Sequence, residues 1–348
     1  MGSGVRERSI MKIDDIKKEA DEKSRMRRYS IHDGFIFRAL TEPATVYDAI
    51  LIKNPEDAPC SCPVLPSSQR TLQEHIDLIN KYHLEKAEIV ANNIDFITEC
   101  PSLKYISITP SDDAGNNFDY SPLYRMPQIK SLFCATVYGK HFELTASVDY
   151  SKIKGLENVS ISGAGHKNYN TIESLKDLGI SQYKDTDLSK MFCSSVLDSL
   201  MIIQCRIKTL NGIQKSKNMQ CLSLYYNRSL SDISALSEVK DTLTSLRIEN
   251  CPKIEDFSVL AELENLEFLD LRGSNSLPSL DFIKSMKNLK TFVFDVNVLD
   301  GDLSPCKDLS FVRTLKNRKH YNLRDDDLPK GEFVYGNEGI DPWRRRRN

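Results

Sequence analysis

Residues 243–251 read LTSLRIENC, residues 266–275 read LEFLDLRGSN, and residues 289–297 read LKTFVFDVN. Each copy has apolar residues at its first, fourth and sixth positions, and the copies begin 23 residues apart, at 243, 266 and 289. Such alternation predicts a short strand with one buried face. The Asn or Cys that follows can hydrogen-bond the backbone where the chain leaves the strand. One unit cannot bury its own face, so the pattern predicts stacked copies.

The pattern continues in both directions, and its spacing and residue types resemble a leucine-rich repeat. We expect strands to start at Leu84, Leu103, Ile129, Leu156, Leu178, Leu197, Met219, Leu243, Leu266, Leu289 and Leu309. The segment SDISALSEV at 231–239 is similar to the convex-side turn of the short bacterial, internalin-type repeat. The resemblance covers residues 84–315. It implies an α/β solenoid: a leucine-rich-repeat horseshoe with a parallel β-sheet on the concave face and short helical or 3-10 turns on the convex face.

Segments at both ends are expected to cap this solenoid, because a terminal repeat would otherwise expose its apolar side. Residues 1–83 are predicted to form an α+β cap, residues 84–315 about ten repeats, and residues 316–348 a C-terminal cap with a basic tail. Within the first region we expect a charged helix at 11–28, strands at 35–40 and 45–52, and a helix from Thr71 to Tyr82. Thr71 and Glu74 have the spacing of a capping box.

Charge and cysteine content indicate the class of partner and the compartment. The 47 basic and 49 acidic residues leave a net charge of −2, so no overall field favours nucleic acid or an anionic membrane. The run Arg344–Arg347 is interpreted as a solvated tail. The nine cysteines are scattered, and the first 30 residues lack the apolar segment of a secretory signal. These features predict reduced thiols and a cytoplasmic protein.

A metal site is the one cofactor hypothesis that the residues raise. Cys60, Cys62, His75 and His83 could supply four ligands, but their spacing matches no familiar zinc unit. No Ser-His-Asp or Cys-His arrangement can be assembled from motifs either. We therefore predict no metal, no cofactor and no catalytic residues.

The outward positions of the repeat are the better guide to function. In the middle of the array these positions are mostly small and polar, with Gln182 and Lys184 assigned to the copy at Leu178. The C-terminal half is predicted to gather a mixed aromatic and charged set: Tyr225, Tyr226, Arg247, Glu249, Phe268, Asp270, Arg272, Asp295, Phe311 and Arg313. Aromatic residues and arginine commonly anchor protein interfaces. The alternative is a solvated face whose charges neutralise each other across strands. Phe268 and Phe311 favour binding, because neither gains from exposure to water.

These observations lead to two hypotheses of function. The first is a non-catalytic scaffold that binds a protein partner on its concave face, with neither nucleic acid nor membrane as a partner. A narrower form is a bacterial cytosolic protein that neutralises a toxin or effector, or acts as an immunity or effector-type protein. The second is an enzyme whose active site lies in residues 1–83 and whose repeats form a substrate-binding arm. A closed pocket with converging polar groups in that segment would favour the second.

Overall fold

A single curved sheet runs through the computed structural model, which describes residues 29–38, 49–53, 66–111, 114, 118–134, 147–161 and 166–334. Within these residues the sheet has 14 strands in the order β1 to β12, then β14 and β16. The strands are β1 Tyr29–His32, β2 Phe35–Arg38, β3 Ala49–Ile52, β4 Lys86–Ala91, β5 Tyr105–Pro110, β6 Ser131–Cys134, β7 Asn158–Ile161, β8 Asp177–Ser181, β9 Ser199–Ile203, β10 Cys221–Tyr225, β11 Ser245–Glu249, β12 Phe268–Arg272, β14 Thr291–Phe294 and β16 Phe311–Thr314. Two short strands, β13 Ser276–Leu277 and β15 Asn297–Val298, pair separately.

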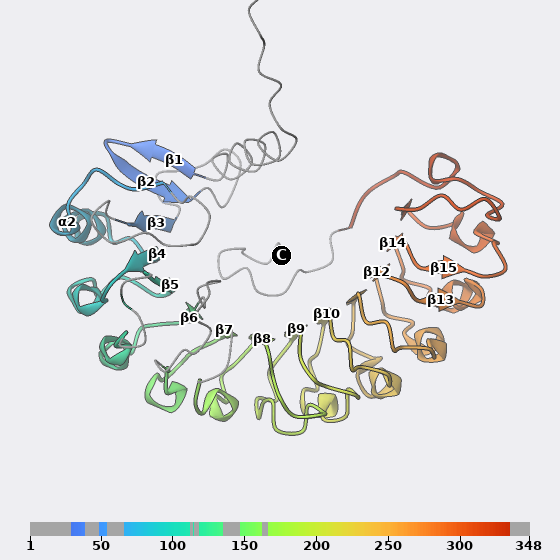
Figure 1. The fold of residues 1–348 in the computed structure, drawn as a ribbon, viewed down its shortest axis with the longest axis horizontal. Helices are drawn as coiled ribbons and strands as arrows, with labels where there is room; N and C mark the ends of the chain where they lie inside the picture. Colours follow the sequence, from blue (N-terminus) through green and yellow to red (C-terminus); the bar gives the residue numbers. More distant parts are fainter. Residues whose placement is uncertain are drawn as a thin grey trace, which may run out of the picture.

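The repeats stack in register from β3 to β16. Every neighbouring pair in this part of the sheet is parallel, and equivalent positions face each other, as in Leu246↔Leu269 and Leu269↔Phe292. The strands line the inside of an arc, and the connecting segments lie outside it (Figure 1). Because the convex segments take more room than strands about 4.8 Å apart, the stack curves into a horseshoe. The predicted leucine-rich-repeat fold is confirmed.

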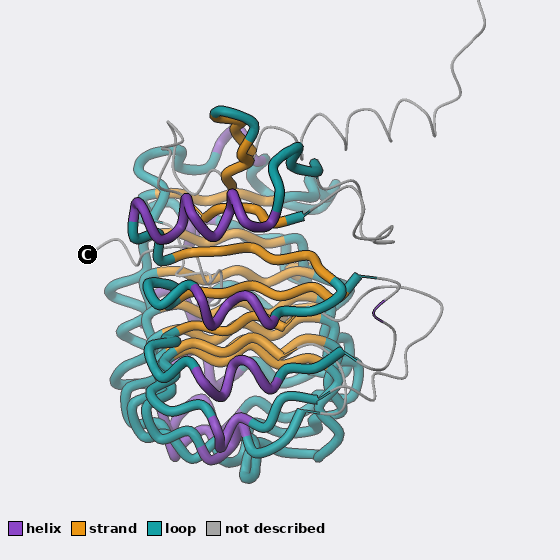
Figure 2. Tube along the Cα trace, turned by 90° about the vertical axis from the view of Figure 1, so that its left-hand side faces the viewer, coloured by secondary structure: helices purple, strands orange, loops and turns teal. Residues whose placement is uncertain are grey.

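The convex side carries short 3-10 turns joined by loops (Figure 2). They are η1 Asp95–Glu99, η3 Ser121–Arg125, η4 Tyr150–Lys152, η5 Tyr169–Thr171, η6 Ile213–Lys215, η7 Ser234–Val239, η8 Ser258–Glu262, η9 Asp281–Ser285 and η10 Ser304–Cys306, with η11 Asp325–Asp327 in the C-terminal cap. Several turns begin with an aspartate that accepts a hydrogen bond from a backbone amide two residues later. Asp232 accepts from Ser234 at 2.9 Å, and Asp256 from Ser258 at 2.8 Å. These side chains satisfy amides that the turn itself leaves without partners.

The N-terminal region extends the same sheet. Helix α2 spans Leu72–Tyr82, and Thr71 and Glu74 form the predicted capping box. Strands β2 and β3 confirm the two expected strands; positions 39–40 and 45–48 of the expected ranges lie outside the described residues. Strand β1 was not predicted; it joins β2 through Asp33 and Gly34, both with positive φ, as a two-residue hairpin turn requires. The expected helix at 11–28 lies outside the described residues.

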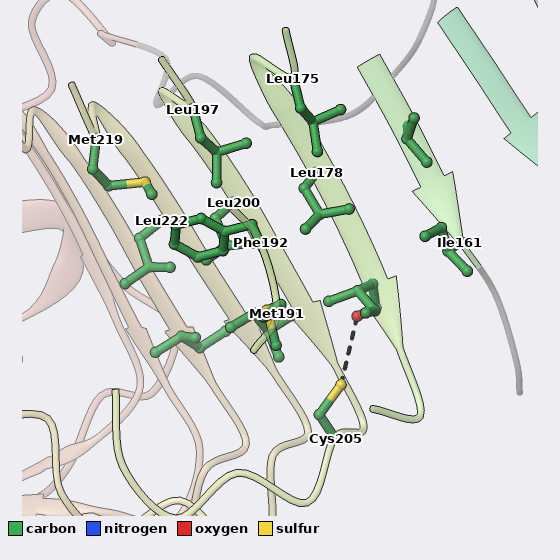
Figure 3. Packing of buried hydrophobic residues seen from close by; sticks show 14 of the residues in the cluster. Ile161, Leu175, Leu178, Met191, Phe192, Leu197, Leu200, Cys205, Met219 and Leu222 are labelled. Carbon is green, nitrogen blue, oxygen red and sulfur yellow. Dashed lines mark hydrogen bonds between the residues drawn. The ribbon is translucent and has the colours of Figure 1, made fainter. Parts of the chain in front are cut away.

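A continuous hydrophobic core follows the arc beneath the sheet. Figure 3 shows the part of this core that lies behind neighbouring repeats, with Leu178, Leu200 and Leu222 at equivalent positions. Behind the strands, buried polar groups link the copies. The Cys205 thiol lies 3.3 Å from the Ile203 carbonyl and 3.6 Å from the Ile180 carbonyl. The Asn227 amide donates to the Ile202 carbonyl at 2.9 Å, and Asn275 donates to Cys251 and Ile254. These contacts satisfy backbone groups where each strand ends.

The core includes residues from all three predicted regions, so the region boundaries stay predictions.

The register predicted for one copy was wrong. Leu175, Leu178 and Ile180 are its three inward residues, so the copy starts at Leu175 and not at Leu178. Starting at Leu178 would have put Ser181 into the core. Gly179 and Ser181 therefore hold the outward positions assigned to Gln182 and Lys184. Gln182 instead lies in the turn after β8, with a φ of 56°.

The residues after β16 pack against the last repeat. Val312 of β16 and Leu328 are both buried. The Tyr321 hydroxyl bridges two loop backbone groups: it accepts from the Val298 amide and donates to the Val296 carbonyl, each at 3.1 Å. The tail at Arg344–Arg347 lies outside the described residues.

Candidate functional site

Serines occupy many outward positions in the middle of the concave face. Ser107, Ser131, Ser199, Ser223 and Ser245 occupy outward positions and are nevertheless buried, because neighbouring strands lie close on both sides. Larger side chains lie among them: Phe133 of β6 and Met201 and Ile203 of β9 are outward and half-buried. Outward aromatic and charged side chains are found together from β10 onward.

An aromatic and charged cluster covers β10 to β12. The Arg247 guanidinium donates to the Tyr225 hydroxyl at 2.7 Å and lies 5.9 Å from the centre of the Tyr225 ring. The same group lies 5.6 Å from the centre of the Phe268 ring. Guanidinium groups are attracted to the faces of aromatic rings. Three consecutive strands thus each contribute one member, and Arg247 holds the two rings in fixed positions.

Asp270 is the anchor of this cluster and is fully buried. Arg272 binds its carboxylate with two hydrogen bonds, at 2.7 and 2.8 Å, and Arg247 forms an ion pair with it at 3.0 Å. Burial raises the pKa of the Asp270 carboxyl, and the two arginines oppose that rise. The expectation that Asp270 faces solvent was wrong. Its side chain points to the concave side, but its neighbours on that side cover it.

Phe268 is also covered, at 2% exposure. The ring of Phe333 packs against it edge-on, with 6.2 Å between ring centres, and against Phe311 at 4.9 Å. Phe311 is half-buried as a result. The two phenylalanines predicted as exposed anchors are therefore not free on the surface. The residues that cover them come from the end of the chain, which the repeat pattern does not describe.

The other predicted residues remain accessible to different degrees. Tyr225, Arg247, Glu249, Arg272 and Asp295 are half-buried, and Arg313 is exposed. Asp295 accepts from the Gly273 amide at 2.6 Å and pairs with Lys316 at 3.3 Å. Tyr226 is 43% exposed and lies in the turn after β10, with a φ of 56°. Its hydroxyl donates to Glu249 at 3.2 Å. Nine of the ten predicted residues share the concave face, and Tyr226 lies at its edge.

Sequence reasoning missed Phe333 and Val334, and it left Thr291, an outward residue of β14, out of the predicted site. Thr291 is fully buried between Phe268 and Phe311 in one column of outward residues, and its hydroxyl accepts from the Val334 amide at 3.0 Å. The run EFVY at 332–335 is rich in aromatic and β-branched residues, which was the available signal of a docked segment.

The N-terminal region bears on the enzyme hypothesis. His75 is buried against Phe35, and its Nδ1 donates to the Thr71 carbonyl at 2.7 Å. Burial lowers its pKa. Cys60 and Cys62 lie outside the described residues. In the part of the chain that the structure describes, no three His, Cys, Asp or Glu residues are grouped as metal ligands. A surface depression is present far from this region, between η9 and η10 on the convex side.

None of the helices in the described ranges is both long enough and apolar enough to span a bilayer.

Comparisons with known proteins match the fold alone. No protein-family model and no curated protein matches the chain. Among solved structures, the chain is similar to an internalin, InlF, of Listeria monocytogenes, with 15% identity, a TM-score of 0.46, and coverage of 72% of this chain and 73% of that one. A leucine-rich-repeat protein of Leptospira interrogans has 16% identity and a TM-score of 0.42, over 72% of this chain and 58% of that one. The functional domain of InlJ from Listeria monocytogenes has 14% identity and a TM-score of 0.36, over 61% and 58%.

Proposed function

We propose that the chain is a non-catalytic scaffold that binds another protein on its concave face, through the outward side chains of β10 to β12. The observation that carries this proposal is the ordered cluster in which Arg247 joins Tyr225 to the buried Asp270. Side chains that are already fixed lose less conformational freedom on binding. Tyrosine and arginine are also the residue types that dominate binding energy at protein interfaces.

The charge of the cluster favours recognition by shape and pairing. Three positive side chains, Arg247, Arg272 and Arg313, are balanced by three negative ones, Glu249, Asp270 and Asp295. A locally neutral surface provides little long-range steering, so binding should depend only moderately on salt. The cluster at β10 to β12 is part of a larger concave surface formed by β10, β11, β12, β14 and β16. These five strands span about 20 Å at about 4.8 Å each, which is enough for one side of a modest interface.

The test begins with identification of the partner, by pull-down from the native host and mass spectrometry. Tyr225→Ala and Glu249→Lys should then each weaken binding about tenfold, as loss of a central interface contact does. Both side chains are half-buried, so they can be changed with less damage to the fold than Phe268 or Asp270. Lys217→Glu, an exposed charge reversal before β10, should leave affinity unchanged.

Deletion of residues 342–348 is a second control, because the basic tail is not expected to contribute. If this deletion abolishes binding while Tyr225→Ala and Glu249→Lys leave it intact, the concave-face assignment is wrong.

The identity of the captured protein also decides the narrower hypotheses. A toxin or effector from the same cell would support a neutralising role in the cytoplasm. The enzyme hypothesis has no supporting observation in the described part of residues 1–83: its strands belong to the sheet, and His75 is buried against Phe35.

A further inference from the structure

The C-terminal segment 329–334 makes two different kinds of contact. Residues 329–331 pair along β16: the Val312 amide donates to the Pro329 carbonyl at 2.9 Å, and the Gly331 amide donates to the Ser310 carbonyl at 2.9 Å. Phe311 and Lys330 form an antiparallel bridge. This part closes the last edge of the sheet. The following residues turn inward, and the described chain ends on the inner side of the arc (Figure 1).

Phe333 and Val334 lie on the concave face and contact three consecutive strands. The Phe333 ring meets Phe311 of β16 and Phe268 of β12 at interplanar angles of 81° and 71°. Between them, the Thr291 hydroxyl of β14 accepts a hydrogen bond from the Val334 amide. Phe268, Thr291 and Phe311 together form a cradle, which we call the aromatic cradle, with one edge-on ring contact on each side and one polar group between.

The aromatic cradle is separate from the hydrophobic core. Leu269 and Leu271 of β12 point into the core, whereas Phe268 points to the opposite face of the sheet. Leu328 already contributes a buried side chain to the core, and residues 329–331 already close the edge. Covering the end of the solenoid therefore does not require Phe333. Its contacts are those of an extended peptide with one aromatic anchor and one main-chain hydrogen bond.

We propose that the aromatic cradle is a subsite of the partner-binding surface, which takes an aromatic residue of an extended polypeptide together with the main-chain amide that follows it. The chain's own Phe333-Val334 occupies this subsite until a partner segment of the same chemistry displaces it. This inference rests on the proposed function, since it extends the same concave surface from β12 to β16. It adds a regulatory step: a segment joined to the sheet competes at a high effective concentration.

A probe peptide tests this competition without the native partner. The probe is LPKGEFV, the sequence of residues 328–334, labelled with fluorescein and amidated. Full-length Phe333→Ala should bind it at least ten times more tightly than the unmodified chain does, because the internal competitor is lost. The matched control is Glu332→Ala, an exposed neighbour in the same segment, which should bind the probe as weakly as the unmodified chain. A probe with alanine in place of phenylalanine should bind neither protein.

Equal affinity of Phe333→Ala and the unmodified chain, or no saturable binding by Phe333→Ala, overturns the proposal. If Phe333→Ala does not fold, hydrogen–deuterium exchange on the unmodified chain decides. Excess probe should accelerate exchange in residues 332–334, and unchanged exchange refutes displacement. Capture of the partner distinguishes the two proposals. If Phe333→Ala binds the probe but Tyr225→Ala does not weaken partner binding, the aromatic cradle stands and the proposed partner surface at β10 to β12 is refuted. If Tyr225→Ala weakens partner binding but Phe333→Ala does not bind the probe, only the aromatic cradle is refuted.

Discussion

Replacement of Asp270 by Asn tests whether the concave cluster is a structural unit. The substitution keeps the shape of the side chain and removes the charge that Arg247 and Arg272 share. Removal of one member of a buried ion pair costs about 3–5 kcal/mol, because the remaining charge loses its partner. The Arg272 side chain is 35% exposed and the Arg247 side chain 14% exposed, so both can regain some contact with water. We therefore expect Asp270→Asn to lower the free energy of unfolding by about 2–3 kcal/mol.

Urea unfolding followed by circular dichroism measures this loss. Asp241→Asn is the matched control, because Asp241 is exposed in the neighbouring repeat. It should change the free energy of unfolding by less than about 0.5 kcal/mol. Long repeat arrays can lose cooperativity, so the slope of the transition must be compared along with its midpoint. If Asp270→Asn shifts the midpoint no more than Asp241→Asn at equal slope, the ion pairs with the two arginines do not stabilise the fold.

Three further predictions concern the core, the convex turns and metal content. Leu269→Ala should leave a cavity in one layer and cost about 2–5 kcal/mol, measured by the same urea unfolding; a shift no larger than that of Asp241→Asn would place Leu269 outside the core. Hydrogen bonds from Ser258 lower the pKa of Asp256 below its ordinary value of 3.8. The ionised Asp256 carboxylate therefore contributes its full stabilisation above pH 3.8, and this contribution is lost as pH falls through the lower pKa of the folded state. The difference in melting temperature between Asp256→Ala and the unmodified chain should thus shrink on acidification. A difference independent of pH would contradict this. The purified chain should hold no stoichiometric zinc by elemental analysis; zinc that survives dialysis against a mild chelator and is lost in Cys62→Ser would refute this.

Local signals allowed most of the fold to be predicted from the sequence. The apolar positions of 243–248 and 266–271 define both the strand and its inward face, because the side-chain period of a strand is two. The Thr71–Glu74 capping box likewise allowed the start of α2 to be predicted, because all its contacts lie within one helical turn. Asp33-Gly34 was an equally local hairpin signal for β1 that the prediction overlooked.

Errors arose where two local patterns competed. Leu175 and Leu178 can each begin a copy of the repeat, and the sequence spacing alone accepts both. The structure selects Leu175, because that register places Leu178 and Ile180 in the core and leaves Ser181 outward. Burial energy in the stacked layers thus corrects a choice that the period alone leaves undecided.

The concave cluster could be predicted in membership but not in exposure. The alternation of side chains along a strand predicts that Phe268 and Asp270 point away from the core, and both do. Whether water reaches them depends on residues that no repeat position specifies: Phe333 follows Phe268 by 65 residues, and only the folded end of the chain brings their rings together. The charged residues do not form a uniformly solvated face: Asp270 is fully buried, whereas Arg247 and Arg272 are partly exposed. Asp270 neutralises both arginines, and its ion pair with Arg247 holds that guanidinium where it donates to the Tyr225 hydroxyl. Charge neutralisation and binding are therefore not competing explanations of this surface, because the buried pairing orders the side chains that a partner would meet.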